Sequence, residues 1–134
     1  MSLQDFPPAS PFLLVEDDLD DQRLLRRAVE AAKPRVAMEV VDGVASAVEY
    51  LLRHRPFAVL SDVHMPLGNG FELLAWIRGR AGLDRLPVLL WTSLPNPEGA
   101  HKAAGLGAAR YVAKPSDLAG YRRVAAMIAT YLGD

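Results

Sequence analysis

The sequence predicts an α/β fold in which one parallel sheet is covered by helices on both faces. Five apolar runs of strand length alternate along the chain with five segments whose apolar residues recur at helical spacing. Most of these runs are continuously apolar, which is typical of strands buried on both faces of a sheet. Because parallel strands need long crossovers, the alternation favours a doubly wound sheet.

The strand candidates are short and are bounded by polar residues or turn signals. They are, in chain order, Phe12–Val15, Val36–Val41, Phe57–Asp62, Pro87–Ser93 and the segment "RYVAK", which ends at Lys114. The dipeptide Asp42–Gly43 predicts a turn after the second strand. Pro66, Gly68 and Gly70 predict a loop after the third strand.

The helix candidates are marked by apolar spacing and by capping residues. They cover Leu24–Ala32, Val44–Leu52, Leu73–Ile77, Pro97–Gly105 and Leu118–Leu132. Asp18 or Asp20 is a candidate N-cap for the first helix, and Asn96 followed by Pro97 is typical of a helix start. The segment "EGAHKAAGLGA" is rich in glycine, so we expect the fourth helix to be weak and mobile.

Composition limits the classes of protein to consider. The chain has 134 residues, 51% of them hydrophobic, which is enough for one domain with a real core. It contains no cysteine, which excludes disulfides, and its net charge of −1 does not favour nonspecific nucleic-acid binding. No apolar run is long enough to span a membrane. The start "MSLQDFPPASP" lacks the layout of a secretory signal, so we expect a flexible leader over 1–11, one domain over 12–134 and a cytoplasmic location.

Chemically reactive side chains follow the predicted strands at the points where the strands end. They are Glu16, Asp17 and Asp18 after the first strand, Asp62 on the third, Thr92 and Ser93 on the fourth, and Lys114 on the fifth. Open parallel sheets bind ligands outside the carboxyl ends of their strands. Crowded carboxylates are neutralised well by a hard divalent cation such as Mg²⁺, and an Asp beside that cation can act as a nucleophile.

Each of these signals is ordinary when taken alone. An acidic run before a helix usually caps that helix, an Asp before a loop is often a turn residue, and Ser or Thr at a strand end is common. Their joint appearance, at successive strand ends in the expected order, indicates a site for phosphoryl transfer. In that site Lys114 and the cation would stabilise charge on the phosphoryl group, and Thr92 could donate to one of its oxygens.

Four stretches resemble the receiver domain of response regulators in two-component signal transduction. They are "LLVEDD", "VLSDVHMPLGNG", "PVLLWTS" and "YVAKP", within a resemblance that covers about Phe12 to Leu132. The arrangement D-x-x-M-P-x-x-x-G, which runs from Asp62 to Gly70, is specific to that family. The resemblance implies a flavodoxin-like, doubly wound (βα)5 sandwich of three layers with the strand order 2-1-3-4-5.

The resemblance also implies a role for each of the acidic residues at the ends of the first and third strands. Asp62 would be the phosphoacceptor. Asp17 would bind Mg²⁺ directly and Glu16 would hold it largely through water, while Asp62 and the backbone carbonyl of His64 would complete the protein ligands. Asp18 has no ligand role in the family pattern and is assigned to helix capping.

Three further residues match the phosphoryl-contact and switch positions of the family. Thr92 would contact the phosphoryl group and Lys114 would pair with it. Thr92 and Tyr111 would form the switch, with the rotamer of Tyr111 following activation. We also expect a cis peptide bond between Lys114 and Pro115, because Lys114 must point into the site while the chain reverses into the last helix.

Several positions depart from common receivers. His64 stands where a small polar residue is usual, Leu94 is apolar where many relatives are polar, and Trp91 is bulky where an aliphatic residue is usual. The proline-rich segment "SLPNPEG" occupies the place where the fourth helix should begin. These departures bear on the rate of dephosphorylation and on the output face, and they leave the acceptor site intact.

The sequence therefore predicts a phosphoprotein of a two-component phosphorelay, not an enzyme acting on a separate substrate. It would take a phosphoryl group from a histidine kinase onto Asp62 as an aspartyl phosphate, with Mg²⁺ as cofactor, and signal through an unknown downstream protein. A homodimer is left open, and direct contact with nucleic acid or membrane is not expected. The segments "VEDDLDDQRLLRRAVE" and "KPSDLAGYRRVAAMI" look similar to stand-alone regulators of phytochrome-type kinases, although a domain of a larger hybrid kinase is an alternative.

Three other functions fit the residues less well. A haloacid-dehalogenase-like hydrolase needs two Asp residues separated by one position at the first strand, whereas Asp17 and Asp18 are adjacent. A nucleotide- or flavin-binding domain needs a Gly-rich turn there, and acids would repel its phosphate. A degenerate receiver acting as a fixed adaptor would lack key positions, and none is missing here.

Overall fold

The structure is a computed structural model that describes residues 10–132. Most of the expected leader over 1–11, and the last two residues of the expected domain, lie outside the described residues. The backbone carbonyl of Pro11 already accepts a hydrogen bond of 3.0 Å from the N–H of Phe57, so hydrogen bonding to the fold begins before residue 12. No helix within the described range is long and apolar enough to cross a membrane.

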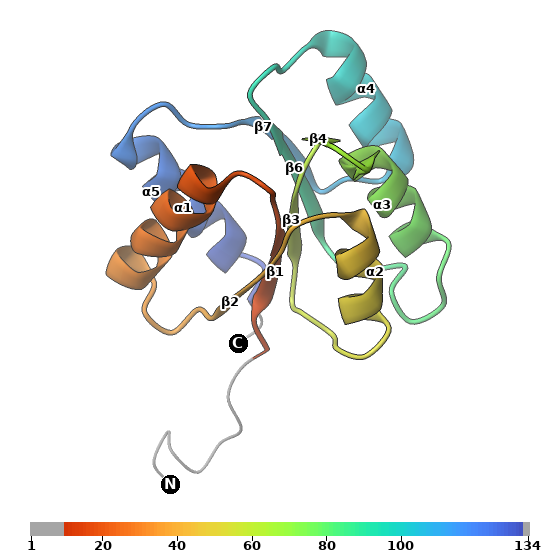
Figure 1. The fold of residues 1–134 in the computed structure, drawn as a ribbon, viewed down its shortest axis with the longest axis horizontal. Helices are drawn as coiled ribbons and strands as arrows, with labels where there is room; N and C mark the ends of the chain where they lie inside the picture. The colour runs from red at the N-terminus through yellow and green to blue at the C-terminus, as the bar shows by residue number, and fades with distance from the viewer. Residues whose placement is uncertain (1–9, 133–134) are drawn as a thin grey trace, which may run out of the picture.

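A five-stranded parallel sheet forms the middle layer of the molecule (Figure 1). Its strands are β1 (Phe12–Val15), β2 (Met38–Val41), β3 (Val59–Asp62), β6 (Val88–Thr92) and β7 (Arg110–Ala113). Their order is β2-β1-β3-β6-β7, and every pairing is parallel. This confirms the predicted order 2-1-3-4-5, in which the chain reverses its winding between β1 and β3.

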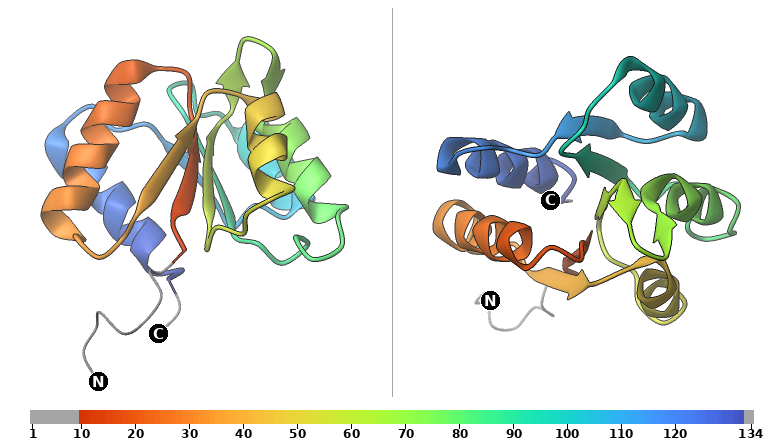
Figure 2. Two further views of the ribbon diagram at one scale, coloured as in Figure 1. Left: turned by 60° about the horizontal axis from the view of Figure 1, so that its bottom comes forward. Right: turned by 45° about the horizontal axis from the view of Figure 1, so that its top comes forward.

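Helices cover both faces of the sheet, as the right-hand view of Figure 2 shows. One face carries α1 (Leu19–Ala32) and α5 (Leu118–Ala129), which pack side by side. The other face carries α2 (Val44–Leu51), α3 (Gly70–Arg78) and α4 (Pro97–Leu106). The predicted five helices are therefore confirmed, and the three-layer arrangement fixes the carboxyl ends of the strands at one edge.

The core is divided by the sheet into two buried clusters. Successive strand residues point to opposite faces, so Leu13 and Val15 join the cluster under α2, α3 and α4, whereas Phe12 and Leu14 join the one under α1 and α5. The cluster under α2, α3 and α4 consists of buried aliphatic side chains with aromatic rings only at its margin, whereas the cluster under α1 and α5 also buries the rings of Phe12 and Trp91. Trp91 is the largest fully buried residue, and it lies on the α1–α5 side.

Capping residues set the starts of the helices. The side chain of Asp18 accepts a 2.9 Å hydrogen bond from the N–H of Asp21, which confirms Asp18 as the N-cap of α1. Asn96 caps α4 and Pro97 is its first residue, as predicted. Gly107 closes α4 with a φ of 90°, a backbone conformation that glycine adopts without strain.

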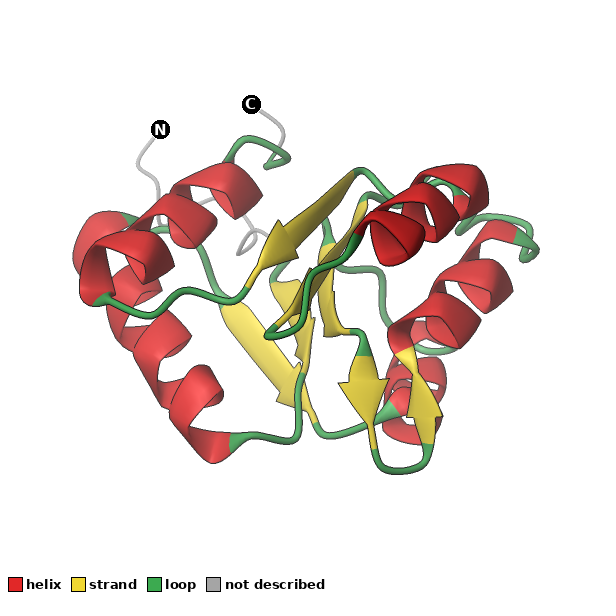
Figure 3. Cartoon of the chain, turned by 90° about the horizontal axis from the view of Figure 1, so that it is seen from above, coloured by secondary structure: helices red, strands yellow, loops and turns green. Residues whose placement is uncertain are grey.

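The segment after β3 holds a small hairpin instead of the plain loop that its proline and glycines predict. Strand β4 (His64–Met65) pairs in antiparallel fashion with β5 (Gly68–Asn69), as Figure 3 shows from above the molecule. Two-residue strands are too short to produce an alternating pattern in the sequence. The hairpin turns at Pro66 and Leu67, and Gly68, the first residue of β5, has a φ of 122° that glycine adopts without strain.

No peptide bond in the described residues is cis, so the predicted cis bond between Lys114 and Pro115 is wrong. The chain reverses over Pro115, Ser116 and Asp117 instead. Asp117 caps α5 by accepting a 2.8 Å hydrogen bond from the N–H of Gly120. Spreading the reversal over these residues allows Lys114 to reach the acids with a trans bond.

Candidate functional site

Three carboxylates meet at the carboxyl edge of the sheet. Glu16 and Asp17 follow β1, and Asp62 ends the adjacent strand β3, where Val15 is paired with Ser61. One oxygen of each carboxylate lies within 4.8 Å of an oxygen of the other two. Glu16 and Asp62 are buried and Asp17 is exposed, so the cluster opens to solvent through Asp17. The predicted acidic cluster therefore exists in the folded chain.

Lys114 brings the positive charge of the site from the end of β7. Its Nζ lies 2.8 Å from Glu16 Oε1, 2.9 Å from Asp21 Oδ2 and 3.1 Å from Asp62 Oδ2. The ammonium also lies 5.5 Å from the ring centroid of Trp91. Every ion pair within residues 10–132 involves Lys114. One cation thus balances several carboxylates, and the site retains excess negative charge.

Asp21 is a member of this cluster that the sequence reasoning missed. It lies in the first turn of α1, where an acidic residue is ordinarily explained by the helix dipole. Its Oδ1 accepts a 2.9 Å hydrogen bond from the hydroxyl of Tyr121 on α5. Its partners Lys114 and Tyr121 are 93 and 100 residues away along the chain, so no local pattern reveals these contacts.

Burial controls the protonation of Glu16. Desolvation raises its pKa to about 7, outweighing the opposing effects of the Lys114 ammonium and of the N–H of Asp18, which donates a 3.1 Å hydrogen bond to Oε2. Oε1 is 2.8 Å from Lys114 Nζ, and apart from that ion pair it has no hydrogen-bond partner among the described residues. A buried carboxylate with so few donors fits a hard divalent cation, which takes oxygen ligands.

The protonation of Lys114 and Tyr121 is set by the same contacts. Desolvation alone would lower the pKa of Lys114, but its contacts with Glu16 and Asp21 reverse that effect and raise the pKa above its ordinary value. Burial, together with the hydrogen bond to Asp21, raises the pKa of Tyr121 to about 12. Lys114 is therefore an ammonium at neutral pH, and the Tyr121 hydroxyl remains a donor.

The carboxylate of Asp62 is held on both sides. Oδ1 accepts a 3.2 Å hydrogen bond from the backbone N–H of His64, and Oδ2 accepts one of 3.1 Å from Lys114. The side chain of His64 is exposed beside it. Gly70 packs against the backbone here, because a Cβ at that position would lie 2.5 Å from the carbonyl oxygen of Asp62. This contact fixes the segment between β3 and α3 near the acid.

Thr92 ends β6, whereas Tyr111 is the second residue of β7 and is paired with Leu90, and neither is joined to the acids by a hydrogen bond in residues 10–132. Thr92 is fully buried, and its Oγ1 accepts a 3.1 Å hydrogen bond from the N–H of Leu94. The Tyr111 hydroxyl accepts a 3.3 Å hydrogen bond from the N–H of Asn96, at the start of α4. Tyr111 is thus directed at α4 and not at the interior next to Thr92.

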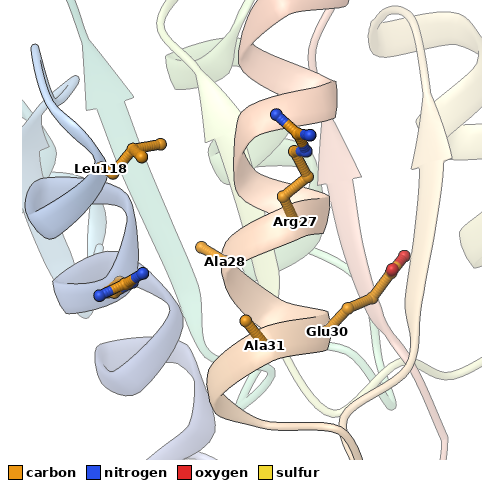
Figure 4. Close-up of a pocket in the computed structure, with 6 residues that line it drawn as sticks. Arg27, Ala28, Glu30, Ala31 and Leu118 are labelled. Carbon is orange, nitrogen blue, oxygen red and sulfur yellow. The ribbon is translucent and has the colours of Figure 1, made fainter.

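Surface depressions of the described residues differ in their relation to the acids. One hollow borders Asp17 directly and is also lined by residues from α1, α2 and the β4–β5 hairpin, so the acid cluster is open to solvent on this side. A separate groove between α1 and α5 is not lined by any of the clustered carboxylates Glu16, Asp17, Asp21 and Asp62 (Figure 4). Its lining residues are Arg27, Ala28, Glu30, Ala31, Leu118 and Arg122.

Comparison with known proteins identifies the family. Residues 12–125 match the family described as "Response regulator receiver domain". The chain is 34% identical over 110 residues to the acid tolerance regulatory protein ActR of Rhizobium meliloti (strain 1021). The aligned region covers 82% of this chain and 55% of ActR. It is 31% identical over 117 residues to the two-component response regulator ORR3 of Oryza sativa subsp. indica, covering 86% of this chain and 88% of ORR3. The match thus spans about half of ActR and most of ORR3.

Solved structures have the same architecture. The bacteriophytochrome response regulator RtBRR superposes with a TM-score of 0.77 at 33% identity, covering 94% of this chain and 79% of RtBRR. The Mn(2+)-bound response regulator Rcp1 gives a TM-score of 0.80 at 25% identity, covering 92% and 94%. The phosphorylated cyanobacterial phytochrome response regulator RcpA shares the fold, with a TM-score of 0.83 at 24% identity and the same coverage of 92% and 94%. This chain belongs to the response-regulator receiver domain family.

Proposed function

We propose that this receiver domain accepts a phosphoryl group from a histidine kinase on Asp62, with Mg²⁺ as cofactor. The observation that carries the proposal is the meeting of Glu16, Asp17 and Asp62 beside the ammonium of Lys114. Receiver domains are signalling modules and not enzymes in the usual sense. The proposed chemistry is accordingly the chain's own phosphorylation and dephosphorylation.

Mg²⁺ suits the donor set. Glu16, Asp17 and Asp62 offer hard oxygen ligands, and the backbone carbonyl of His64 is the proposed fourth protein ligand. The relative Rcp1 has a Mn(2+)-bound form, and Mn(2+) is another divalent cation that prefers oxygen ligands, which supports a divalent metal in this protein. When bound, the cation would neutralise charge on the transferring phosphoryl group.

The proposed reaction is a displacement at phosphorus. A carboxylate oxygen of Asp62 attacks, a P–O bond to Asp62 forms, and the P–N bond of the kinase phosphohistidine breaks, so the imidazole nitrogen leaves with the bonding pair. Lys114, already 3.1 Å from Asp62, would pair with a phosphoryl oxygen. The hydroxyl of Thr92, buried at the end of β6, would donate to another oxygen.

The proposed output passes from Thr92 to the face formed by α4, β7 and α5. Pulling the Thr92 hydroxyl toward the phosphoryl group would leave room for Tyr111 to turn inward. That rotation would break its contact with Asn96 at the start of α4. An unidentified downstream protein, or a second copy of this chain, would then bind the altered face.

A phytochrome-type histidine kinase is the proposed phosphodonor. RtBRR and Rcp1 are response regulators, and the first is described as a bacteriophytochrome response regulator. RtBRR is 33% identical to this chain, which supports a donor of the same class. A phosphotransfer profile against the histidine kinases of the source genome would identify the partner.

Incubation with radiolabelled acetyl phosphate and Mg²⁺ tests the central proposal. We expect the wild type to take up label and Asp62→Asn to take up none. Excess chelator should prevent labelling of the wild type. Label that persists in Asp62→Asn, or in chelator, would contradict the assignment of Asp62 or of the metal.

A further inference from the structure

Both carboxylate oxygens of Asp21 have partners. Oδ2 accepts a 2.9 Å hydrogen bond from Lys114 Nζ, and Oδ1 accepts one of 2.9 Å from the hydroxyl of Tyr121. The side chains of Asp21 and Lys114 are only 16% and 11% exposed, so water competes weakly for this contact. The ring of Tyr121 is itself fixed, since it packs edge-on against buried Trp91 with the ring centroids 6.3 Å apart. Asp21 is therefore held rigidly between α1 and α5, with one oxygen facing the lysine.

In the proposed function, some carboxylates around Lys114 take part in the reaction and one does not. The inference drawn from this difference rests on the proposed function. An ammonium has three N–H donors, and three carboxylates lie around this one. Two of them, Glu16 and Asp62, are needed by the cation and the phosphoryl group. Asp21 is the carboxylate that the reaction leaves free to hold the ammonium.

We propose that Asp21 is a positioning residue for phosphoryl transfer, which holds the ammonium of Lys114 where it meets the phosphoryl group. Asp21 acts only through Lys114 and does not itself contact phosphate. Because the ammonium has three donors, it can keep Asp21 while another N–H turns from Asp62 to a phosphoryl oxygen. Tyr121 keeps Asp21 in place during that exchange.

Asp21 also has a second effect, which would lower the rate of phosphoryl transfer instead of raising it. Its negative charge would repel an incoming anionic donor and slow the reaction. That charge is already paired with Lys114 at 2.9 Å, however, and an ion pair repels a distant anion much less than a free carboxylate does. The direct contact with the lysine therefore outweighs the repulsion, and removal of Asp21 slows transfer.

The test compares labelling rates with acetyl phosphate at saturating Mg²⁺. We expect Asp21→Asn to react about tenfold more slowly than the wild type, which corresponds to ~1.4 kcal/mol of activation free energy. Tyr121→Phe should be slowed less and in the same direction. Asp20→Asn is the matched control, since it removes the same charge from an adjacent exposed position that makes no ion pair with any residue of 10–132. We expect its rate to equal that of the wild type.

The Lys114→Met background separates positioning from a merely structural effect. In that background we expect Asp21→Asn to cause no further slowing, because its target is gone. An equal slowing in both backgrounds overturns the proposal, as does an Asp21→Asn rate equal to or above the wild-type rate. If the Asp21 proposal fails but the wild type still takes up label, the proposed function stands. If the wild type takes up no label, the proposed function and the Asp21 proposal are both overturned. If circular dichroism shows that Asp21→Asn does not fold, Tyr121→Phe decides, and a wild-type rate in that variant overturns the proposal.

Discussion

Oε1 of Glu16 lies 2.8 Å from the ammonium of Lys114, yet the pKa of Glu16 is raised to about 7 by burial. The nearby ammonium favours the charged carboxylate, and loss of water disfavours it more strongly. A site with this balance is poorly satisfied without a further cation. The metal-free protein therefore carries an electrostatic cost that depends on pH.

Metal-free protein should become less stable as pH rises through about 7. The folded-state pKa of Glu16 is raised above its ordinary value, so the folded chain binds this proton more tightly than the unfolded chain does. The stabilisation from that proton is complete below the unfolded pKa and is lost as pH rises through the folded pKa. We expect a loss of up to about 3 kcal/mol in the free energy of unfolding between about pH 5 and pH 8.

Urea denaturation in chelator, at both pH values, measures this loss. Glu16→Gln cannot titrate and serves as the control, so its stability relative to the wild type should improve as the pH rises. Addition of Mg²⁺ should restore the wild type at the higher pH, because a cation binds the deprotonated carboxylate. A wild type and Glu16→Gln with parallel pH profiles would contradict the raised pKa.

Trp91→Phe should be tolerated, although Trp91 is fully buried. Its indole Nε1–H has no hydrogen-bond partner among the described residues, and a buried donor without a partner costs about 1–3 kcal/mol. Phe removes that donor and retains a ring against Tyr121, which offsets the smaller buried area. We expect a loss below about 1 kcal/mol for Trp91→Phe, against about 3–5 kcal/mol for Trp91→Ala.

Circular dichroism in urea is the suitable probe, since Trp76 would complicate fluorescence. A loss for Trp91→Phe close to that for Trp91→Ala would mean that the indole N–H is satisfied in solution. The comparison also bears on the unusual bulk of Trp91 at this strand position. If the prediction holds, the bulk serves packing under α1 and α5 and not hydrogen bonding.

Gly99→Ala should turn Tyr111 away from α4. A Cβ at position 99 would collide with the hydroxyl of Tyr111, and the end of a tyrosine side chain can move more easily than a helix backbone. We expect loss of the hydrogen bond from the N–H of Asn96 and a few-fold tighter binding of beryllofluoride, if inward Tyr111 belongs to the phosphorylated state.

Gly105→Ala provides the matched control for that experiment. It lies in the same helix, a Cβ there meets open space, and it should add a similar ~1 kcal/mol of helix propensity. Tyr111 ring resonances should therefore shift in Gly99→Ala and not in Gly105→Ala. Equal shifts in the two variants would assign the effect to helix stability instead of to the Tyr111 contact.

The order of the elements could be predicted because most strands lie in largely apolar runs such as Phe12–Val15. The β4–β5 hairpin could not, since two-residue strands such as His64–Met65 leave no periodic trace. The bond before Pro115 was predicted to be cis from the need to reverse the chain, but the capping of α5 by Asp117 supplies that reversal. The choice depends on tertiary context that the sequence does not display locally.

The difference between local pattern and tertiary context also explains which members of the acid cluster the sequence predicts. Glu16, Asp17, Asp62 and Lys114 end strands, and a parallel sheet brings strand ends to one edge whatever the loops do. Asp21 comes from a helix, and its contact with Lys114 depends on how α1 packs beside α5. Helix packing angles cannot be read from apolar spacing alone.

The response to phosphorylation should be concentrated between Leu94 and Lys114. Helix α4 has low intrinsic stability, because its glycines lower helix propensity and Ala103 is its one buried residue. Tyr111 contacts the start of this helix from β7. Release of that contact can therefore shift α4 at low cost, whereas α2 is anchored by buried Ala47 and Leu51.

Amide NMR shifts with and without beryllofluoride measure this response. Reversal of a 1:99 ratio of states takes about 5.5 kcal/mol of differential binding, so a modest phosphoryl contact gives incomplete switching and some activity without phosphate. We expect the largest shifts within Leu94–Lys114, with Tyr111→Ala reducing those at the start of α4. Shifts concentrated instead on Asp42–Arg53, with α4 unmoved, would show that the signal leaves the site through α2, and the proposed route from Thr92 to Tyr111 would be wrong.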